Sequence, residues 1–136
     1  MTASRSTVAP GGRGVGRASY DGPMSSIFAK IVARDVPATI VAEDDRVIAF
    51  EDIAPKAPVH VLVVPKTEQY QNVTELAAGD PDLLAHVVAT AQRIADERSG
   101  GQYRLVFNTG ETVGQTVFHV HAHVLAGDLQ EGTLAS

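Results

Sequence analysis

Apolar residues recur at helical spacing in two segments of the chain. In the longer segment, Asp80 can cap the free amides, Pro81 suits the first helical position, and Gly100-Gly101 supplies the end. The apolar positions of this helix are Leu83, Leu84, Val87, Val88, Ala91, Ile94 and Ala95. The shorter segment, 27–34, has apolar residues on one side and is followed by Pro37, which ends it. The pattern therefore predicts two helices.

Five other segments have the β-branched or alternating composition of strands. They are residues 39–42, 46–50, 59–64, 103–108 and 117–125. The acidic residues 43–45 are a plausible tight turn between the first two strands, and the nearly continuous apolar run 59–64 is typical of a central strand covered on both faces. Short helices beside several hairpin-connected strands predict an α+β domain with a mainly antiparallel sheet.

Composition and charge narrow the possible functions. The 136 residues suit one domain, and the absence of cysteine excludes disulfides, thiolate metal sites and thiol catalysis. No apolar run approaches the ~18 residues of a membrane span, so we expect a cytoplasmic protein with no membrane partner. The net charge is −5, and residues 25–136 carry −7 (8 basic against 15 acidic), which argues against a nucleic acid polymer as partner.

The beginning and end of the chain differ in composition from the middle. Residues 1–24 contain five of the twelve glycines, a net charge of +2 and no apolar core like that of a secretory signal. We expect residues 1–24 to be a disordered arm or upstream extension, residues 25–127 to be the domain, and residues 128–136 to be a tail.

Three histidines alternate with apolar residues in the last predicted strand. His119, His121 and His123 would share one face there, because side chains alternate along a strand. They could be partly exposed structural residues, or His119 and His121 could bind Zn²⁺ or Fe²⁺, with His60 or Asp52 as a further ligand. A third explanation is phosphorus chemistry, in which a neutral imidazole attacks an activated phosphate.

The loop before this strand favours phosphorus chemistry. Gly114 lets backbone N–H groups approach an anion, and Gln115 and Thr116 add polar side chains. Asn108, at the end of the preceding strand, could direct its amide to the same place. Such preset donors stabilise the charge that develops on phosphoryl oxygens.

These motifs together resemble the histidine triad (HIT) family and, within it, the Hint branch of nucleoside phosphoramidate hydrolases. Residues 119–125, His-Val-His-Ala-His-Val-Leu, match the family signature His-φ-His-φ-His-φ-φ at every position, where φ is apolar. The likeness extends from about Ser26 to Gly127. It includes Ile27-Phe28, residues 43–46, Ala49-Phe50, Asp52-Ile53, Ala57-Pro58, His60, Val64-Pro65-Lys66, Asn108 and Gly114-Gln115. It implies a HIT-like fold whose five-stranded sheet, with two helices, extends across a homodimer.

The resemblance also implies a role for individual residues. His121 would attack the α-phosphorus and form a nucleotidyl-histidine intermediate that water hydrolyses. His119 would orient the ring of His121 through its backbone carbonyl, His60 would lie beside the leaving group, and Asp52 would bind the ribose hydroxyls. Phosphate contacts would come from His123, Asn108, Gly114, Gln115, Thr116 and the backbone N–H of Val117. A purine would lie between Ile27, Phe28, Ile31, Phe50 and Ile53.

The resemblance implies cleavage of purine nucleoside phosphoramidates or adenylated amines, with no cofactor and no metal. His123 argues against the nucleotidyl transferase branch, which has Gln at the third histidine. Cysteines that bind zinc in some bacterial relatives are replaced here by Ser25, Ser26 and Ala29. Thr116 stands where Hint enzymes have Ser, and the tail 128–136 lacks their aromatic and proline residues, so leaving-group preference does not transfer.

Two alternatives to this reaction remain open. One is a metal-dependent hydrolase or oxygenase that uses His119 and His121. The other is a module that binds purine nucleotides without useful catalysis. Activity that disappears with a chelator would indicate the first, and tight AMP binding without hydrolysis would indicate the second.

The composition of the N-terminal segment leads to a first prediction. Deletion of residues 1–23 should leave the thermal midpoint of unfolding and the turnover rate almost unchanged, because this segment has few residues that could join a core. Calorimetry and steady-state kinetics of the shortened chain would check it. A large loss of either quantity would show that the segment packs on the domain.

Overall fold

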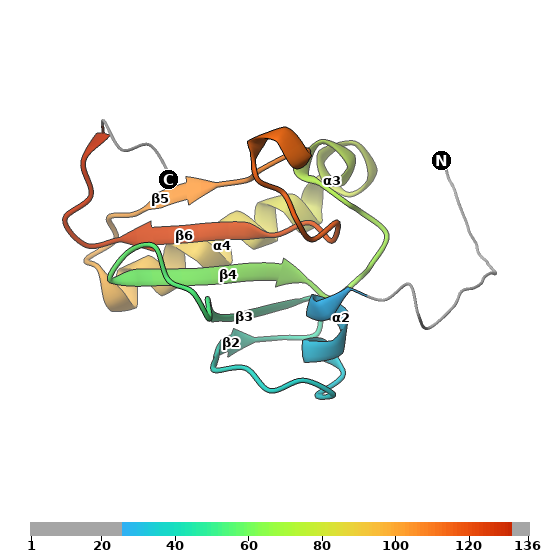
Figure 1. The fold of residues 1–136 in the computed structure, drawn as a ribbon, viewed down its shortest axis with the longest axis horizontal. Coiled ribbons are helices and arrows are strands. Elements are labelled where there is room, and N and C mark those ends of the chain that lie inside the picture. The colour runs from blue at the N-terminus through green and yellow to red at the C-terminus, as the bar shows by residue number, and fades with distance from the viewer. Residues whose placement is uncertain (1–25, 132–136) are drawn as a thin grey trace.

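The computed structural model of the protein describes residues 26–131 (Figure 1). Its helices are α2 (Ile27–Val32), α3 (Val73–Gly79) and α4 (Pro81–Arg98), with a 3₁₀ turn η2 (Glu111–Val113). Its strands are β2 (Ile40–Glu43), β3 (Val47–Glu51), β4 (Val59–Pro65), β5 (Arg104–Val106) and β6 (Ala122–Ala126). In chain order the elements are α2, β2, β3, β4, α3, α4, β5, η2 and β6. The five strands form one sheet in the order β2-β3-β4-β6-β5, and every neighbouring pair is antiparallel. The predicted α+β class with a five-stranded antiparallel sheet is confirmed.

Strand β4 lies at the centre of the sheet, between β3 and β6. Leu62 pairs with Phe50 on one side and with His123 on the other. Val61 and Val63 point into the core beneath α4, whereas Leu62 packs with residues of α2. The run 59–64 is therefore apolar except at His60, because both of its faces are covered, as predicted.

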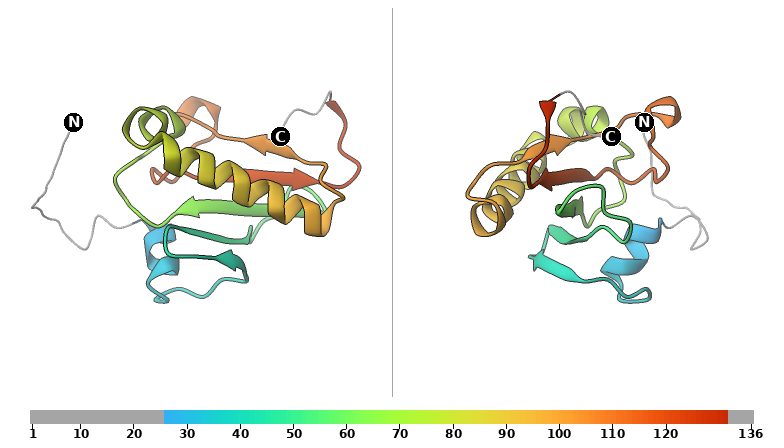
Figure 2. Two further views of the ribbon diagram at one scale, coloured as in Figure 1. Left: turned by 180° about the vertical axis from the view of Figure 1, so that it is seen from behind. Right: turned by 60° about the vertical axis from the view of Figure 1, so that its left-hand side comes forward.

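Helix α4 covers one face of the sheet, as Figure 2 shows from behind. Its side chains pack with residues from β3, β4, β6 and α3 in a core that comprises Val47, Ala49, Val61, Val63, Leu76, Leu83, Val87, Ala91, Ile94, Val120, Ala122 and Val124. The predicted start is confirmed, since Pro81 is the first residue and the carboxylate of Asp80 accepts the N–H of Leu83. Gly100 follows the helix with a φ of +62°.

Helix α2 covers the opposite face (Figure 2). Its buried residues, Phe28 and Ile31, pack with Ile48, Phe50, Leu62 and Val64 of β3 and β4. The helix ends at Val32, two residues before the predicted end. The reason is local, because Arg34 adopts a φ of +66° and turns the chain away well before Pro37.

The last strand is shorter than predicted. Strand β6 begins at Ala122, so His119 and His121 precede it. Before that point the chain leaves the sheet, and the N–H of Val120 donates to the carbonyl of Tyr70. The side chains nevertheless keep alternating, because Val120 and Ala122 lie in the core beneath α4 while the rings of His119 and His121 contact Phe28 of α2.

Helix α3 is an element that the apolar pattern does not predict. Asn72 caps it through the N–H of Glu75, and the carboxylate of Glu75 accepts the N–H of Gln71. Asn72 and Glu75, three residues apart, have the spacing of a capping box, a sequence signal for a helix start, although Glu75 binds the N–H of Gln71 and not that of Asn72. Only Leu76 is buried in this helix, which leaves it without an apolar stripe.

Two other expectations concern membrane spans and the ends of the chain. Among residues 26–131, no helix combines the length and the apolar composition that a bilayer crossing requires. The expected arm 1–24 lies outside the described residues, as do residues 132–136 of the expected tail. The expected domain boundaries therefore stay predictions.

The cap of α4 gives a prediction about stability. Replacement of Asp80 by Ala should lower the free energy of unfolding by about 1 kcal/mol, because the N–H of Leu83 loses its side-chain acceptor. Asp80→Asn should lose less, since Asn caps equally well and only the partly exposed ion pair with Arg46 disappears. Urea denaturation of both variants would measure the two changes. Equal losses would mean that the cap contributes nothing beyond the ion pair.

Candidate active site

Four histidines lie in a row on the α2 side of the sheet. His60 is in β4, His123 is in β6, and His121 and His119 immediately precede β6. The ring centroids of His60 and His123 are 5.2 Å apart, and those of His123 and His121 are 5.1 Å apart. Phe28 of α2 contacts the rings of both His121 and His119. Residues 60 and 119–123 therefore meet although they are far apart in sequence.

Both ring nitrogens of His119 are used by the protein. Its Nε2 lies 2.7 Å from the carbonyl oxygen of Pro65, which can only accept, so Nε2 carries the proton. Its Nδ1 then accepts the hydroxyl proton of Ser26 at 2.7 Å. The side chain is 1 % exposed, and burial lowers the pKa of His119, although the Pro65 carbonyl raises it. His119 is thus a neutral ring whose two nitrogens are both held by hydrogen bonds.

His121 has one ring nitrogen hydrogen-bonded, and the other has no partner among residues 26–131. Its Nδ1 lies 2.9 Å from the backbone carbonyl of His119, so Nδ1 carries the proton and Nε2 keeps its lone pair. Burial lowers the pKa of His121 from 6.5, the His119 carbonyl raises it, and the neighbouring ring of His119 lowers it. At neutral pH His121 is therefore an uncharged imidazole with a nucleophilic Nε2.

His60 and His123 are hydrogen-bonded to each other, and a backbone N–H determines which of the two rings donates the proton. The N–H of Lys56 donates to Nδ1 of His60 at 2.9 Å, so Nε2 of His60 carries the proton. That proton is donated to Nδ1 of His123, 2.9 Å away, which leaves the proton of His123 on its Nε2. A carboxylate oxygen of Asp52 lies 3.3 Å from Nε2 of His60, and the other accepts the N–H of Ala54.

Burial is the main cause of the low pKa of both histidines. It lowers the pKa of His123 from 6.5 to about 4, with further lowering from His121 and His60 and an opposing effect of Asp52. Burial also lowers the pKa of His60, against the raising effect of Asp52. The four rings can lie within contact because all of them are neutral at pH 7.

The loop before the histidines is shaped by Gln115, which is 3 % exposed. Its side-chain oxygen accepts the N–H of Gly110, and its amide nitrogen donates to the carbonyls of Gln71 and Val117. Both amide protons are thus used within the protein. Gly110 and Gly114 have φ values of +103° and +99°, which suit glycine and allow the tight loop.

This fold and this row of histidines agree with what comparison with known proteins shows. The sequence pattern of the HIT domain matches residues 33–130, most of the chain.

The chain belongs to the HIT family.

Relatives with similar sequences or structures support this membership. A HIT-like protein of Synechocystis is 48% identical over 106 residues, which cover 75% of this chain and 90% of the relative. A HIT family hydrolase from Clostridium thermocellum is 42% identical, with a TM-score of 0.74 and coverage of 79% of this chain and 95% of that one. A histidine triad nucleotide-binding protein from Candida albicans is 28% identical, with a TM-score of 0.63 and coverage of 74% and 73%.

The side chains expected around a purine divide into two groups in this HIT protein. Phe28, Ile31 and Phe50 are buried where α2 packs on the sheet. Ile27 and Ile53 are 44% and 100% exposed, so they are free to contact a ligand. The contact of Phe28 with His121 places the exposed part of α2 beside the histidines.

The groups expected to contact phosphate also divide into two. Within residues 26–131, neither the N–H groups of Thr116 and Val117 nor the amide of Asn108 have a hydrogen-bond partner, so they are available to a ligand. The side chain of Val117 packs against the α2 cluster, which holds this loop close to the histidines. Gln115, by contrast, acts on the loop and has no spare amide proton.

The metal alternative fits these residues poorly. His119 has no free nitrogen, so His119 and His121 do not form a chelating pair. Asp52, His60 and His123 have ligand atoms within 4.8 Å of one another. However, a metal on Nε2 of His60 would require a proton on Nδ1, which already faces the N–H of Lys56. The hydrogen bonding of this site thus opposes a metal ion.

Three groups that bind the histidine rings were not predicted from the sequence. The carbonyl of Pro65 and the N–H of Lys56 are backbone groups, which no side-chain pattern reveals. Ser26 precedes an apolar helix and is recognisable as a cap, but its hydrogen bond to His119 spans 93 residues. Only the fold brings these groups to the histidines.

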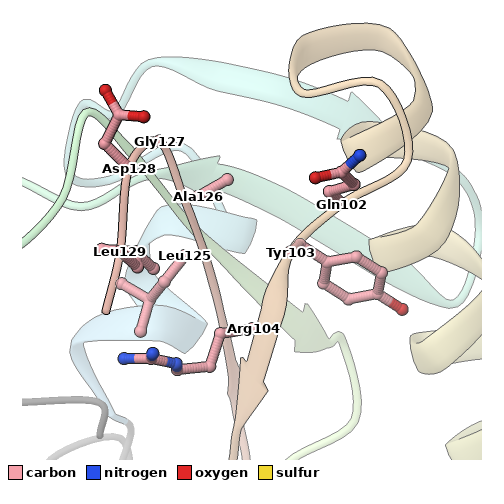
Figure 3. A pocket seen from close by; sticks show the side chains of 8 residues that line it. All are labelled: Gln102, Tyr103, Arg104, Leu125, Ala126, Gly127, Asp128 and Leu129. Atoms are coloured by element: carbon pink, nitrogen blue, oxygen red, sulfur yellow. The ribbon is translucent and has the colours of Figure 1, made fainter. Parts of the chain in front are cut away.

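A hollow elsewhere on the molecule is not part of this site. It has a volume of about 400 Å³ and lies at the start of β5 and the end of β6 (Figure 3). His119, His121 and His123 lie before or at the start of β6, and His60, although it pairs with Leu125, does not line the hollow. Its charged lining residues are Arg104 and Asp128, and it has no histidine. The candidate site is therefore the row of histidines.

The low histidine pKa values predict how stability depends on pH. Unfolded histidines bind protons near pH 6.5, whereas His123 in the folded protein does so only near pH 4. The free energy of unfolding should therefore fall as the pH decreases from 6.5 to about 4, because the unfolded chain takes up more protons. Urea denaturation at several pH values would measure this decrease. His123→Asn should reduce it, and an unchanged stability over this interval would contradict the assignment of neutral rings.

Proposed function

We propose that this protein is a nucleotidyl hydrolase of the Hint type, which cleaves purine nucleoside phosphoramidates or adenylated amines. The observation that carries the proposal is the state of His121. Its Nδ1 proton is held by the His119 carbonyl, so the lone pair of Nε2 is available before any substrate arrives. A neutral nitrogen in this state attacks an activated phosphate without a separate base.

The first chemical step transfers the nucleotidyl group to the enzyme. Nε2 of His121 forms a bond with the α-phosphorus as the bond between phosphorus and the leaving nitrogen breaks. The N–H groups of Thr116 and Val117 and the amide of Asn108 stabilise the charge on the phosphoryl oxygens. In the second step a water oxygen attacks the phosphorus, the bond to His121 breaks, and a nucleoside monophosphate is released.

His123 supplies the proton that the leaving nitrogen requires. It is neutral in the free protein, but an anionic phosphate beside it favours its charged form, as does Asp52. Protonated His123 donates to the departing nitrogen and recovers a proton from the attacking water. The sum of the two steps is substrate plus water giving nucleotide plus amine.

The nucleotide part of the proposal is supported by the surroundings of the histidines. The Asp52 carboxylate suits ribose hydroxyls, and the exposed Ile27 and Ile53 offer apolar surface for a base. The Candida albicans relative is named as a nucleotide-binding protein, and the Clostridium thermocellum relative is named as a hydrolase. Both properties are combined in the proposed reaction.

A homodimer belongs to the same proposal. Strand β5 is at the edge of the sheet and pairs only with β6 within the described chain. An edge strand of this kind can continue the sheet into a second copy. Sedimentation equilibrium would distinguish a dimer from a monomer.

The nucleophile can be tested by one substitution. His121→Ala should lower kcat for an adenosine phosphoramidate by several orders of magnitude, while AMP binding remains measurable. His86→Ala is the matched control: His86 lies on α4 and pairs with Asp44, in the turn between β2 and β3, so this variant should leave turnover intact. Steady-state kinetics and calorimetric AMP titration would measure both. Substantial turnover by His121→Ala would mean that another group is the nucleophile.

Rapid quenching followed by mass spectrometry would identify the intermediate. One added nucleotide should appear on the peptide that contains His121. A chelator should leave the rate unchanged, and activity that requires added Zn²⁺ or Fe²⁺ would overturn the metal-free proposal. Tight AMP binding without turnover of phosphoramidates or dinucleotides would instead indicate a binding module.

A further inference from the structure

The first turn of α2 is connected to the histidine row through Ser26. The hydroxyl oxygen of Ser26 accepts the N–H of Ala29 at 2.9 Å, as an N-cap does. The same oxygen lies 2.7 Å from Nδ1 of His119. One hydroxyl therefore both starts the helix and binds a triad histidine 93 residues away in sequence.

The direction of this second hydrogen bond follows from the far side of the ring. Because Nε2 of His119 donates to the Pro65 carbonyl, Nδ1 has no proton and must accept. The Ser26 hydroxyl donates its only proton there and uses a lone pair for Ala29. Ser26 and Pro65 together thus determine the tautomer and the rotation of the His119 ring.

The orientation of His119 affects His121 through the backbone. The carbonyl that holds the Nδ1 proton of His121 belongs to His119 itself. This segment lies outside β6, and the N–H of the same peptide unit, that of Val120, donates to the carbonyl of Tyr70 at 3.0 Å. The buried His119 ring, hydrogen-bonded at both nitrogens, is a second support for this peptide unit.

Ser26 is itself held by a carboxylate. Glu68, in the connection between β4 and α3, accepts the backbone N–H of Ser26. Glu68 lies three residues after Pro65, whose carbonyl binds the other side of His119. The end of β4 therefore binds Nε2 of His119 through Pro65, and the connection after it holds Ser26, which binds Nδ1 of the same ring.

We propose that Ser26 is a positioning residue for the nucleophile, that it acts through His119, and that Glu68 supports it. No contact of Ser26 with substrate is required. This inference rests on the proposed function, in which His121 is the nucleophile. It assigns a catalytic consequence to a helix cap that would otherwise serve stability alone.

The direct test is the tautomer of His121, observed by nitrogen NMR of the full-length, histidine-labelled protein at pH 7.5 without substrate. In the original protein, Nδ1 should be protonated and Nε2 unprotonated. In Ser26→Ala, the His121 signals should shift towards a mixture of tautomers, because the His119 ring loses one anchor. Ser26→Thr retains the hydroxyl and should restore the original spectrum.

Kinetics provide the second readout. Ser26→Ala should lower kcat on the order of tenfold to a hundredfold while KM changes little, since the nucleophile is misplaced but the ligand contacts remain. Glu68→Ala should have a smaller effect, and the double variant should be no worse than Ser26→Ala, because both act through one contact. Ser99→Ala, at the end of α4, is the matched control and should match the original protein.

The outcomes separate this inference from the function on which it rests. An unchanged His121 spectrum and unchanged kcat in folded Ser26→Ala would overturn the positioning role and leave the hydrolase intact. A shifted spectrum in a protein that never hydrolyses phosphoramidates would support positioning and overturn the proposed function. A loss of kcat in Ser26→Ala that accompanies a lower free energy of unfolding, with the His121 tautomer unchanged, would overturn the positioning role and show a role in helix stability only.

Discussion

The site depends on one hydrogen bond, from Nδ1 of His121 to the carbonyl two residues earlier in the chain. This bond is made entirely within the protein, so the proton is already on the correct nitrogen when the site is empty. Water could satisfy Nδ1 equally well at an exposed position, but the buried surroundings leave the backbone carbonyl as its partner. Burial therefore favours the uncharged ring, and the hydrogen bond to the carbonyl favours the tautomer with a free Nε2.

The pleat of the sheet explains how a small domain accommodates this site beside a core. In β4 and β6, alternate residues pack beneath α4, and the residues between them face α2 or the histidines. The α4 face is almost wholly apolar. The other face is divided between an apolar half, where α2 packs, and a polar half that contains the four rings. Helices α4 and α3 thus cover one face, and α2 covers only the apolar half of the other, which leaves the four rings beside α2.

Much of this arrangement could be predicted from the sequence, because it depends on patterns that are local. The cap at Asp80, the hairpin of β2 and β3 and the central position of β4 all follow from short motifs. The shared face of the histidines was also predicted, although His119 and His121 precede the strand itself. What the sequence does not contain is the partner of each ring nitrogen. Pro65, Lys56 and Ser26 reach the rings through tertiary packing, and two of them act through backbone atoms.

The register between β4 and β6 determines both which residues enter the core and where the histidines lie. Leu62 pairs with His123, and Val61 pairs with Val124, so neighbouring pairs face opposite sides of the sheet. If β6 shifted by one residue along β4, the side chains of the histidines would exchange places with those of the core. Such a molecule would bury imidazoles beneath α4 and expose valines beside α2. A change of register between these two strands would therefore disturb the candidate site and the core at once.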